Sequence, residues 1–429
     1  MYWYLETRSS GAVDLTRART TFSGMKKCLI CDSLIEPFVS FGRMPIANGF
    51  LQADQFQEEY FFELAAGFCP ECTMVQLIEQ PEPQKMFHEN YAFYSSTSTR
   101  MAAHFQELAG RVKDSYMKSK DPFVVEIGSN DGITLRHFAA AGFRHLGVEP
   151  SANVAEAARK KGVQTVCQFF DENVAREILG AHGPADVFLG ANVMCHISTL
   201  HSVVAGIKLL LKPEGVLIFE DPYLGDIIQK TSYDQIYDEH AFYFSLRSLT
   251  FLFERHGMEV IDVMPQDVHG GSMRYTVGRK GAHDIAGSVE LLRERENALG
   301  LHDPATYHRL RENIERSRDE LMNLLGKLKK QGSRVAGYGA TSKSTTVINY
   351  CGITPELVEF IGDTTPIKQG KFSPGMHIPV RPYADFENNH PNFALLFAWN
   401  HVAEIMEKER QFLANGGRWI VYVPRVEIL

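Results

Sequence analysis

The stretch FVVEIGSNDG, residues 123–132, decides the fold of this 429-residue chain. Its first half, Phe123–Ile127, is mostly apolar and predicts a buried strand, and Gly128–Gly132 predicts the turn after it. A helix is expected from Thr134, and the next strand ends on Glu149. This order is typical of a ligand-binding α/β domain, because glycines let a ligand approach the backbone and a terminal acid accepts hydrogen bonds from ribose hydroxyls.

The loop has the pattern E-x-G-x-x-x-G, which resembles the first motif of class I methyltransferases, the enzymes that bind S-adenosylmethionine. It lacks the third glycine of the GxGxxG loop that holds a pyrophosphate, and S-adenosylmethionine has no phosphate. The alternation continues with a strand at Ala185–Leu189, a helix at His201–Leu211 and a strand ending at Glu220. The expected cofactor contacts follow three of the strands: Glu126, Gly128, Asn130, Asp131, Gly132, Glu149 and Asn192.

Four of the seven cysteines form two CxxC pairs, Cys28 with Cys31 and Cys69 with Cys72. Two such pairs supply the four thiolates of a tetrahedral zinc site, which leaves no open position for chemistry. One alternative is a redox-active CxxC motif, but a thioredoxin-like βαβ setting is missing. Another is four unligated core cysteines, which seldom occur at this spacing. We therefore expect a structural zinc ion. The other cysteines have no assigned role: Cys167, Cys195 and Cys351.

A second group of chemistry-bearing residues lies in TSYDQIYDEHAFYFSL, residues 231–246, beyond the strand that ends at Glu220. Ligands of open α/β sheets bind at the carboxyl ends of the strands, so this stretch is expected at the cofactor edge. His240, with Glu239 to orient it, has the chemistry of a general base near neutral pH. Each residue alone would more often be a structural group, and the clustering favours function. The further candidates are Tyr237, His196 and Tyr91.

Ordered segments along nearly the whole chain resemble the sugar-nucleotide C-methyltransferases of antibiotic deoxysugar biosynthesis, particularly those acting at C-3. The resemblance implies a multidomain α/β fold: an N-terminal zinc-binding region, a central class I methyltransferase domain and a C-terminal Rossmann-like domain. It also implies S-adenosylmethionine and structural Zn²⁺ as cofactors, and a dTDP-linked 3-amino-4-keto-deoxysugar as substrate. The segments are the two CxxC pairs, VEIGSNDG, CHI, FEDPYLGDI, YDEH, VHGGSMRY, YGATSKSTTVINYCGI, GDTTPIKQGKFSPGMHIPV, FAWNH and RWIVYVP.

The same resemblance implies a general base at His240, with helpers at Tyr91, His196, Tyr237 and Glu239. A ketone at C-4 of the sugar acidifies the hydrogen on C-3, because the resulting carbanion is delocalised as an enolate. The base removes that proton and the carbon attacks the donor methyl, while a tyrosine or His196 donates to the oxyanion. No metal is needed for this reaction, because the ketone accepts the electrons.

A helical connector and a second α/β unit follow. Two amphipathic helices are expected on either side of Gly300–Pro304. After Gly332, a strand (Arg334–Tyr338), a hydroxyl-rich loop with a lysine (Gly339–Ser344) and the N-terminus of a helix that begins at Thr345 suit a pyrophosphate. A second strand is expected at Val358–Ile361. The resemblance implies that this domain holds the substrate's nucleotide, and the alternative is a Rossmann-like repeat without a ligand. The candidate substrate contacts are Ser272, Arg274, Ser342, Lys343, Ser344, Asp363, Trp399 and Asn400.

Three other functions remain open from the sequence. An O- or N-methyltransferase would bind the same cofactor and could also use His240 as a base. A zinc-containing scaffold, for assembly or RNA binding, is disfavoured by the intact glycine loop and by the balance of 44 basic against 52 acidic residues. An NAD-dependent sugar dehydratase is disfavoured by the missing GxGxxG loop and by the lack of a Tyr-x-x-x-Lys pair beside one.

Composition bounds the location and partners. The formal net charge is −8, no apolar run approaches the roughly 18 residues of a membrane span, and the odd cysteine count disfavours a secreted disulfide framework. We expect a cytoplasmic protein that binds neither nucleic acid nor membrane, and the resemblance implies a monomer. The N-terminus lacks a signal-peptide pattern.

The expected domain division of the chain is a flexible extension (1–24), a zinc-binding domain (25–95), a methyltransferase domain (96–280), a helical connector (281–331) and a C-terminal nucleotide-sugar-binding domain (332–429).

Overall fold

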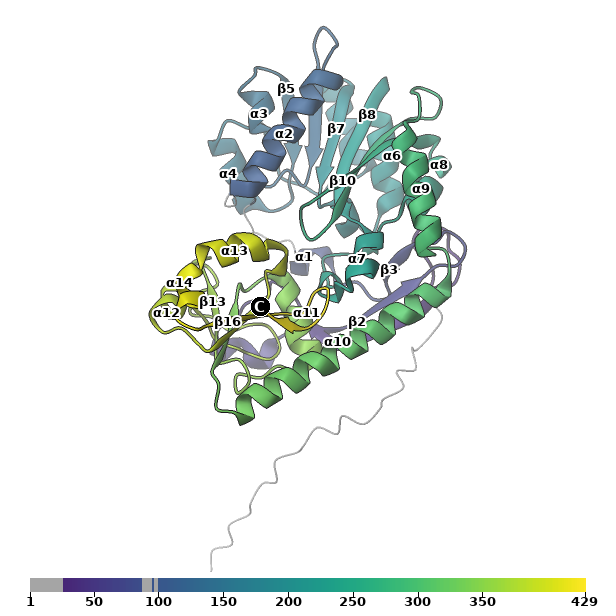
Figure 1. The fold of residues 1–429 in the computed structure, drawn as a ribbon. Coiled ribbons are helices and arrows are strands. Elements are labelled where there is room, and N and C mark those ends of the chain that lie inside the picture. Colours follow the sequence, from purple (N-terminus) through teal and green to yellow (C-terminus); the bar gives the residue numbers. More distant parts are fainter. Residues whose placement is uncertain (1–25, 87–94, 96–98) are drawn as a thin grey trace, which may run out of the picture.

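The computed structural model describes residues 26–86, 95 and 99–429, which form three β-sheets with helices around them (Figure 1). The expectations for the first 24 residues and for Tyr91 lie outside these residues. Among the described helices, none is both long enough and apolar enough to cross a bilayer.

The central sheet has seven strands in the order β10-β11-β8-β7-β4-β5-β6, with β11 antiparallel to both neighbours. Successive side chains of β4 face opposite sides, so Phe123 and Val125 belong to one apolar core and Val124 to another. Helices therefore cover both faces. The strands are β4 (Phe123–Ile127), β5 (Arg144–Val148), β6 (Thr165–Val166), β7 (Ala185–Ala191), β8 (Leu211–Pro222), β10 (Met258–Gln266) and β11 (Ser272–Arg279).

The chain leaves β4 toward β5 on one side and reaches β7 on the other, so the order reverses beside β4. Loops diverge at such a point and leave room for a ligand at the carboxyl ends of the strands. The helices of this part are α2 (Thr99–Ser115), α3 (Arg136–Ala139), α4 (Ala152–Lys160), α5 (Glu172–His182), η3 (Met194–His196), α6 (Leu200–Leu210), α7 (Leu224–Lys230), η4 (Tyr233–Gln235), α8 (Leu246–Arg255) and α9 (Gly287–Leu299).

The N-terminal sheet has the order β1-β2-β3-β9, and its last strand comes from a distant part of the sequence. β9 (Phe242–Tyr243) directly follows the stretch that contains His240 and pairs antiparallel with β3. His240 is therefore two residues before a strand of the sheet that belongs to the zinc-binding region. The other elements are β1 (Glu36–Pro45), η1 (Ala53–Glu58), β2 (Phe61–Phe68), β3 (Val75–Leu77) and α1 (Pro83–Met86).

The C-terminal sheet has the order β14-β13-β12-β15-β16-β17, and every pair except β16–β17 is parallel. Its core continues into the N-terminal sheet, because Phe41 and Leu64 belong to the same apolar cluster as Val347 and Ile361. The elements are β12 (Val335–Tyr338), α11 (Ser342–Cys351), β13 (Ile361–Asp363), β14 (Val380–Pro382), α12 (Tyr383–Asn388), β15 (Phe393–Leu396), η5 (Trp399–His401), α13 (Val402–Lys408), α14 (Arg410–Ala414), β16 (Arg418–Val421) and β17 (Glu427–Ile428).

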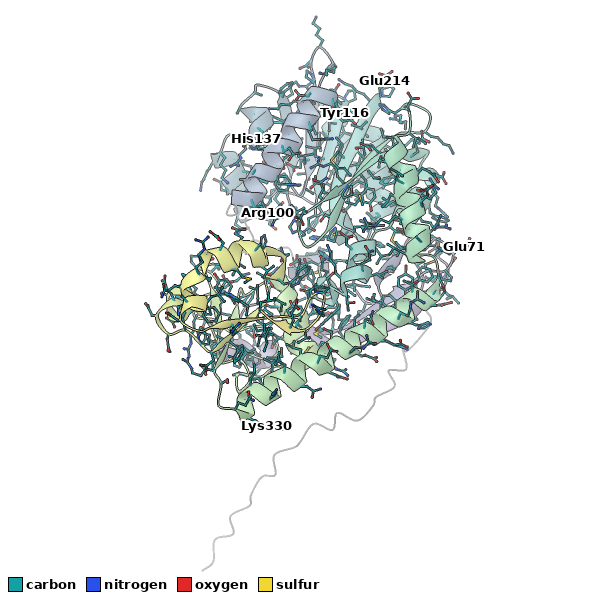
Figure 2. The ribbon with its side chains drawn as sticks, in the orientation of Figure 1. Glu71, Arg100, Tyr116, His137, Glu214 and Lys330 are labelled. Carbon is teal, nitrogen blue, oxygen red and sulfur yellow. The ribbon has the colours of Figure 1, made fainter. Side chains whose placement is uncertain are left out.

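The two expected connector helices are confirmed. α9 ends at Gly300, whose φ of 67° is the left-handed conformation that glycine adopts readily, and Asp303 caps α10 (Pro304–Lys330). Figure 2 shows Glu71, of the second cysteine pair, on the side where α10 begins, and Lys330 at the end of α10. The apolar stripe of α10 packs against β1 and α11, as expected. It consists of Tyr307, Leu310, Ile314, Leu321, Leu325 and Leu328.

Two expected boundaries were wrong. The strand predicted at Val358–Ile361 begins only at Ile361, because the Val358 N–H donates to the Thr354 carbonyl in a turn (3.1 Å). The first helix of the C-terminal domain, α11, begins at Ser342 rather than Thr345, because Thr341 caps it by accepting from the Ser344 N–H. The hydroxyl-rich segment is therefore the first turn of a helix and not a free loop.

Candidate active site

The loop after β4 adopts a backbone that only particular residues tolerate. Gly128 and Gly132 have φ values of 57° and 78°, and a Cβ atom on Gly128 would lie 2.7 Å from Val193 Cγ2. Asn130 after β4 and Asn192 after β7 also have positive φ, at 47° and 52°. Asparagine is among the few side chains enriched in this conformation. The loops after β4 and β7, on either side of the point where the strand order reverses, therefore both contain residues with left-handed backbone conformations.

Glu149 ties the glycine loop to the end of β5. Its carboxylate accepts from the Asn130 N–H (3.0 Å) and the Ser151 N–H (2.9 Å), and burial raises its pKa. On the other side, Asn192 Oδ1 is buried without a hydrogen-bond partner among the described residues. An amide oxygen that lacks a partner at the edge of a ligand crevice is explained by a ligand donor. The polar groups of these loops therefore fit S-adenosylmethionine, which Glu149, Asn130 and Asn192 would contact.

The other two acidic candidates in this loop are buried. Asp131 accepts from Lys161 Nζ at 2.7 Å. Glu126 lies within β4, and burial raises its pKa to about 8.

The two CxxC pairs meet at one point. The sulfur–sulfur distances are 3.5 Å for Cys28–Cys72 and 3.4 Å for Cys31–Cys69, and all four sulfurs lie within 4.8 Å of one another. Four thiolates around zinc at about 2.3 Å would be separated by about 3.8 Å. Hydrogen bonds among the sulfurs lower the pKa of Cys69 and raise that of Cys28. The donor set fits a closed, structural zinc site.

The local turns explain why these pairs converge. The Asp32 N–H donates to the Cys28 carbonyl and the Thr73 N–H to the Cys69 carbonyl, and both donors have left-handed φ values (62° and 58°). In each turn, both cysteine sulfurs therefore point toward the same position, where all four sulfurs meet. His201 of α6 donates its Nε2–H to the Ile30 carbonyl (2.9 Å), which attaches the first turn to the central domain.

His240 is buried between the central and C-terminal domains. Its Nδ1 lies 2.9 Å from the Gln235 carbonyl oxygen, which can only accept, so Nδ1 carries the hydrogen. In the neutral ring, Nε2 then bears the lone pair, and the Tyr237 hydroxyl lies 3.0 Å from it. Burial, reinforced by His196 and Lys343, holds the pKa of His240 well below its usual range. The ring is therefore neutral near pH 7, with Nε2 able to accept a proton.

His196 and Tyr237 are the predicted helpers that the structure brings to His240. The ring centroids of His196 and His240 are 5.1 Å apart, and burial lowers the pKa of His196 to about 3. Cys195 lies beside them, and one donor atom each from Cys195, His196 and His240 fall within 4.8 Å. Both ring nitrogens of His240 have protein partners, the Gln235 carbonyl and the Tyr237 hydroxyl.

Glu239 has a different position from the one expected. Its Oε1 accepts from Asn48 Nδ2 (2.6 Å), in the segment after β1, and the hydrogen-bond partner that orients the His240 ring is the Gln235 carbonyl. A backbone carbonyl could not be identified as the orienting group from residue types alone.

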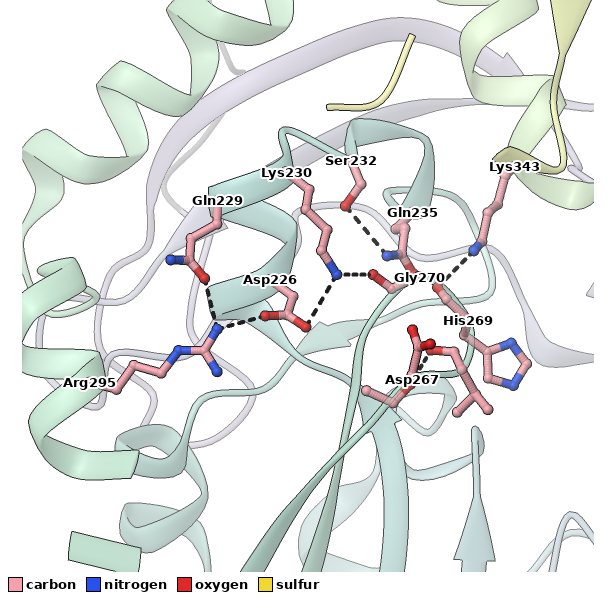
Figure 3. A network of polar contacts seen from close by, with 12 residues as sticks. Asp226, Gln229, Lys230, Ser232, Gln235, Asp267, His269, Gly270, Arg295 and Lys343 are labelled. Atoms are coloured by element: carbon pink, nitrogen blue, oxygen red, sulfur yellow. Dashed lines mark hydrogen bonds and ion pairs between the residues drawn. The ribbon is translucent and has the colours of Figure 1, made fainter. Parts of the chain in front are cut away.

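The β10–β11 hairpin reaches the C-terminal domain with its tip. Lys343 Nζ donates to the His269 carbonyl (3.0 Å) and Lys230 Nζ to the Gly270 carbonyl (2.6 Å), as Figure 3 shows. Gly270 has φ 88°, and a Cβ there would lie 2.5 Å from the Trp399 ring, whose centroid is 5.6 Å from Lys343 Nζ. The structure thus brings Lys343 and Trp399 together at the hairpin tip.

Four of the remaining substrate candidates have protein partners: Ser272, Arg274, Ser344 and Asp363. Ser272 Oγ donates to the Val268 carbonyl, and Arg274 pairs with the buried Glu220, which His104 of α2 also contacts (2.6 Å). These contacts hold the hairpin against β8. The C-terminal candidates lie at the first turn of α11 (Ser342 and Ser344), at the end of β13 (Asp363, which accepts from the Ala340 N–H at 2.6 Å) and in η5 (Asn400).

Two residues of this region were not predicted. Lys368 Nζ donates to the Ala340 carbonyl (2.8 Å) and lies over the Phe50 ring, close to the first turn of α11. Asp234 is completely buried and accepts hydrogen bonds from two side chains of the C-terminal domain. In the sequence, each looks like an ordinary charged loop residue, and only long-range packing distinguishes it.

Family models cover nearly the whole chain. A putative zinc binding domain matches residues 28–87, a methyltransferase domain matches 86–263, and a C-methyltransferase C-terminal domain matches 267–424. Among curated proteins, the C-methyltransferase NovU of Streptomyces niveus is 35% identical over 407 residues, which cover 94% of this chain and 96% of NovU.

Solved structures resemble only part of the chain. Magnesium protoporphyrin IX methyltransferase from Synechocystis, with bound SAH, is 13% identical, with coverage of 42% of this chain and 83% of that one and a TM-score of 0.33. The mitomycin 7-O-methyltransferase MmcR is 21% identical, with coverage of 41% and 54% and a TM-score of 0.32. Likenesses of this size add nothing to the assignment.

Proposed function

Because the chain belongs to the C-methyltransferase family and depends on S-adenosylmethionine, we propose that it methylates C-3 of a nucleotide-linked 4-keto-deoxysugar. The proposed substrate is a dTDP-linked 3-amino sugar of the kind incorporated into antibiotics. The observation that carries this proposal is His240, a buried neutral imidazole whose Nε2 bears its lone pair at the carboxyl edge of the central sheet.

The proposed reaction begins with proton removal by His240. The C-3–H bond breaks, its proton passes to Nε2, and the electron pair is delocalised onto the C-4 oxygen as an enolate. The carbanion then forms a bond to the donor methyl as the bond from that methyl to sulfur breaks. S-adenosylmethionine supplies the electrophilic methyl, and the residues proposed to hold it are Glu149, Asn130 and Asn192, together with the glycine turn.

The developing oxyanion needs hydrogen-bond donors. Tyr237 is proposed for this role because its hydroxyl already lies 3.0 Å from His240 Nε2, where the substrate hydrogen must arrive. His196 is the second candidate donor, and Tyr91 is carried over from the sequence as a third. We propose that Glu239 acts on the site through Asn48, which it contacts directly.

We propose that the C-terminal domain binds the nucleotide. Lys343, with Ser342 and Ser344, begins α11, where backbone N–H groups and a cation favour an anion. Trp399 offers an aromatic face beside the same lysine. Binding energy from this remote part would hold the sugar in place at His240. Ser272, Arg274, Asp363 and Asn400 complete the proposed set.

We also propose the expected domain division: 25–95, 96–280, 281–331 and 332–429, with the extension at 1–24. A four-thiolate zinc site requires reduced cysteines, which supports a cytoplasmic enzyme. We further propose that it acts as a monomer, without nucleic acid or membrane.

The decisive experiment separates carbon acidification from methyl transfer. The wild-type protein, incubated in D₂O with a dTDP-3-amino-4-keto-deoxysugar and no methyl donor, should incorporate deuterium at C-3. His240→Asn should lose this exchange and at least about a hundredfold of turnover, because general-base catalysis contributes that much. Its dissociation constant for S-adenosylmethionine should stay unchanged.

The matched control is His137→Asn, on the surface of the central domain in α3 (Figure 2), which should exchange normally. Methylation at oxygen or nitrogen without C-3 exchange would contradict the proposal. So would full exchange by His240→Asn.

A further inference from the structure

The segment before His240 is anchored by the C-terminal domain at a buried carboxylate. Asp234, in η4, is 0% exposed. Its Oδ2 accepts from Trp399 Nε1 at 2.6 Å and from the Tyr422 hydroxyl at 2.8 Å. Trp399 lies in η5 and Tyr422 directly follows β16, so both donors belong to the C-terminal sheet and its loops.

A second anchor lies two residues further along. The Ile236 carbonyl accepts from Thr346 Oγ1 of α11 at 2.9 Å, and both residues are buried. The residue between the two anchors, Gln235, has the carbonyl that accepts the Nδ1–H of His240. The Gln235 carbonyl lies in one peptide plane with the Ile236 N–H, so the anchors at Asp234 and Ile236 limit the rotation of this plane.

The direction of the Gln235 carbonyl decides which His240 nitrogen carries the hydrogen. If the carbonyl turns away, Nδ1 loses its acceptor and the preference for the lone pair on Nε2 disappears. The hydrogen bonds to Asp234 and to the Ile236 carbonyl therefore connect the C-terminal domain to the carbonyl that accepts the Nδ1–H of His240.

We propose that Asp234 is a positioning residue for His240, held by Trp399 and Tyr422 so that the C-terminal domain orients the base. This inference rests on the proposed function, in which His240 is the base. It also connects the two ligand sites, because the Trp399 ring that donates to Asp234 has Lys343 Nζ 5.6 Å from its centroid. A nucleotide that binds Lys343 would therefore lie close to the Trp399 ring, which donates a hydrogen bond to Asp234.

The first test is independent of activity. In ¹⁵N-histidine-labelled protein without ligands, the Nδ1–H signal of His240 is identified by its loss in His240→Asn. We expect this hydrogen to exchange at least about tenfold faster with solvent in Tyr422→Phe, Trp399→Phe and Asp234→Ala. Asp234→Asn should restore slow exchange, because its single amide oxygen can accept both hydrogen bonds.

The second test is kinetic. Tyr422→Phe and Asp234→Ala should each lower kcat by about tenfold or more, with little change in KM for the sugar nucleotide, because small misplacement of a catalytic group is costly. The matched control is Tyr338→Phe, which also removes a tyrosine hydroxyl bonded to a buried carboxylate in the same domain (Glu409, 2.7 Å). It should leave both the Nδ1–H exchange and kcat unchanged.

Tyr422→Phe keeps the ring that fills the core, so it tests the inference even if Asp234→Ala fails to fold. Nδ1–H exchange and kcat in Tyr422→Phe that match those of Tyr338→Phe would overturn the inference. If instead His240 proves not to be the base, His240→Asn keeps C-3 exchange, while the Nδ1–H measurement on Tyr422→Phe still reports whether Asp234 holds the ring.

Discussion

At the scale of single residues, the site depends on ionisable groups buried in their neutral forms. His240 and His196 have lowered pKa values because burial disfavours their charged forms. Glu126 and Asp221 have pKa values raised to about 8 for the same reason. These four side chains at the carboxyl edge of the central sheet are therefore predominantly neutral near pH 7.

Glu126 makes the stability of the unliganded protein depend on pH. Its ordinary pKa is 4.5 and burial raises the folded value to about 8. The folded state thus keeps a proton that the unfolded state loses above about pH 4.5, so the free energy of unfolding falls as pH rises toward 8. The slope is on the order of 1 kcal/mol per pH unit. Glu126→Gln should therefore show a smaller decrease in melting temperature than wild type between pH 5.5 and pH 7.5.

Glu214→Gln is the control for that comparison, because Glu214 is exposed (Figure 2). It should reproduce the wild-type dependence on pH. An equal decrease in melting temperature for Glu126→Gln and wild type would contradict the assignment of a neutral Glu126.

At the scale of elements, two short turns and one short strand connect the zinc site to the catalytic edge. Each CxxC pair lies at the end of the N-terminal sheet or next to it, and β9 adds the residues after His240 to that sheet. The zinc ion therefore stabilises a sheet on which the site depends. It has no open coordination position for the reaction itself.

Replacement of any one of the four zinc ligands by serine should abolish the site. Cys28→Ser, Cys31→Ser, Cys69→Ser and Cys72→Ser should each lower the metal content from about one zinc per chain toward none, because the binding energy is also folding energy. Atomic absorption measures the metal, and melting temperature should fall in parallel. Cys167→Ser is the control, since Cys167 is exposed and lies far along the sequence in the central domain. Full zinc content in a ligand variant would refute the assignment.

At the scale of the whole molecule, the site lies where three sheets meet. The central sheet supplies the loops after β4 and β7, and the N-terminal sheet includes β9, which follows the His240 segment (Figure 1). The C-terminal domain contacts Asp234 through Trp399 and Tyr422, and it contacts the hairpin tip through Lys343 (Figure 3). The C-terminal and N-terminal sheets share one apolar core, so they act as a common support.

This arrangement predicts separate effects on the two ligands. Lys343→Met should weaken binding of dTDP at least about tenfold, because the only amine of this first helical turn is lost, and should leave the affinity for S-adenosylmethionine unchanged. Calorimetry with each ligand alone measures both. Lys329→Met, which removes a surface lysine paired with Glu356, should change neither. Unchanged dTDP binding in Lys343→Met would move the nucleotide site elsewhere.

The local elements follow from the sequence because their signals are short-range. The strand Phe123–Ile127, the glycine turn after it and the break between α9 and α10 are set by apolar runs, glycine and a helix cap within a few residues. The CxxC spacing likewise determined the four-cysteine cluster, because both sulfurs of a pair can face one ion.

Only the tertiary structure decided how these parts act on one another. The partner of the His240 Nδ1–H is a backbone carbonyl, and its anchors, Trp399 and Tyr422, lie more than a hundred residues away from Asp234. Sequence periodicity reports which face of an element is apolar, but it contains no information on which distant polar groups will meet when those faces pack. The sequence therefore determined the fold, the cofactor loop and the candidate base, while long-range packing decided which nitrogen of that histidine carries the hydrogen and which bears the lone pair.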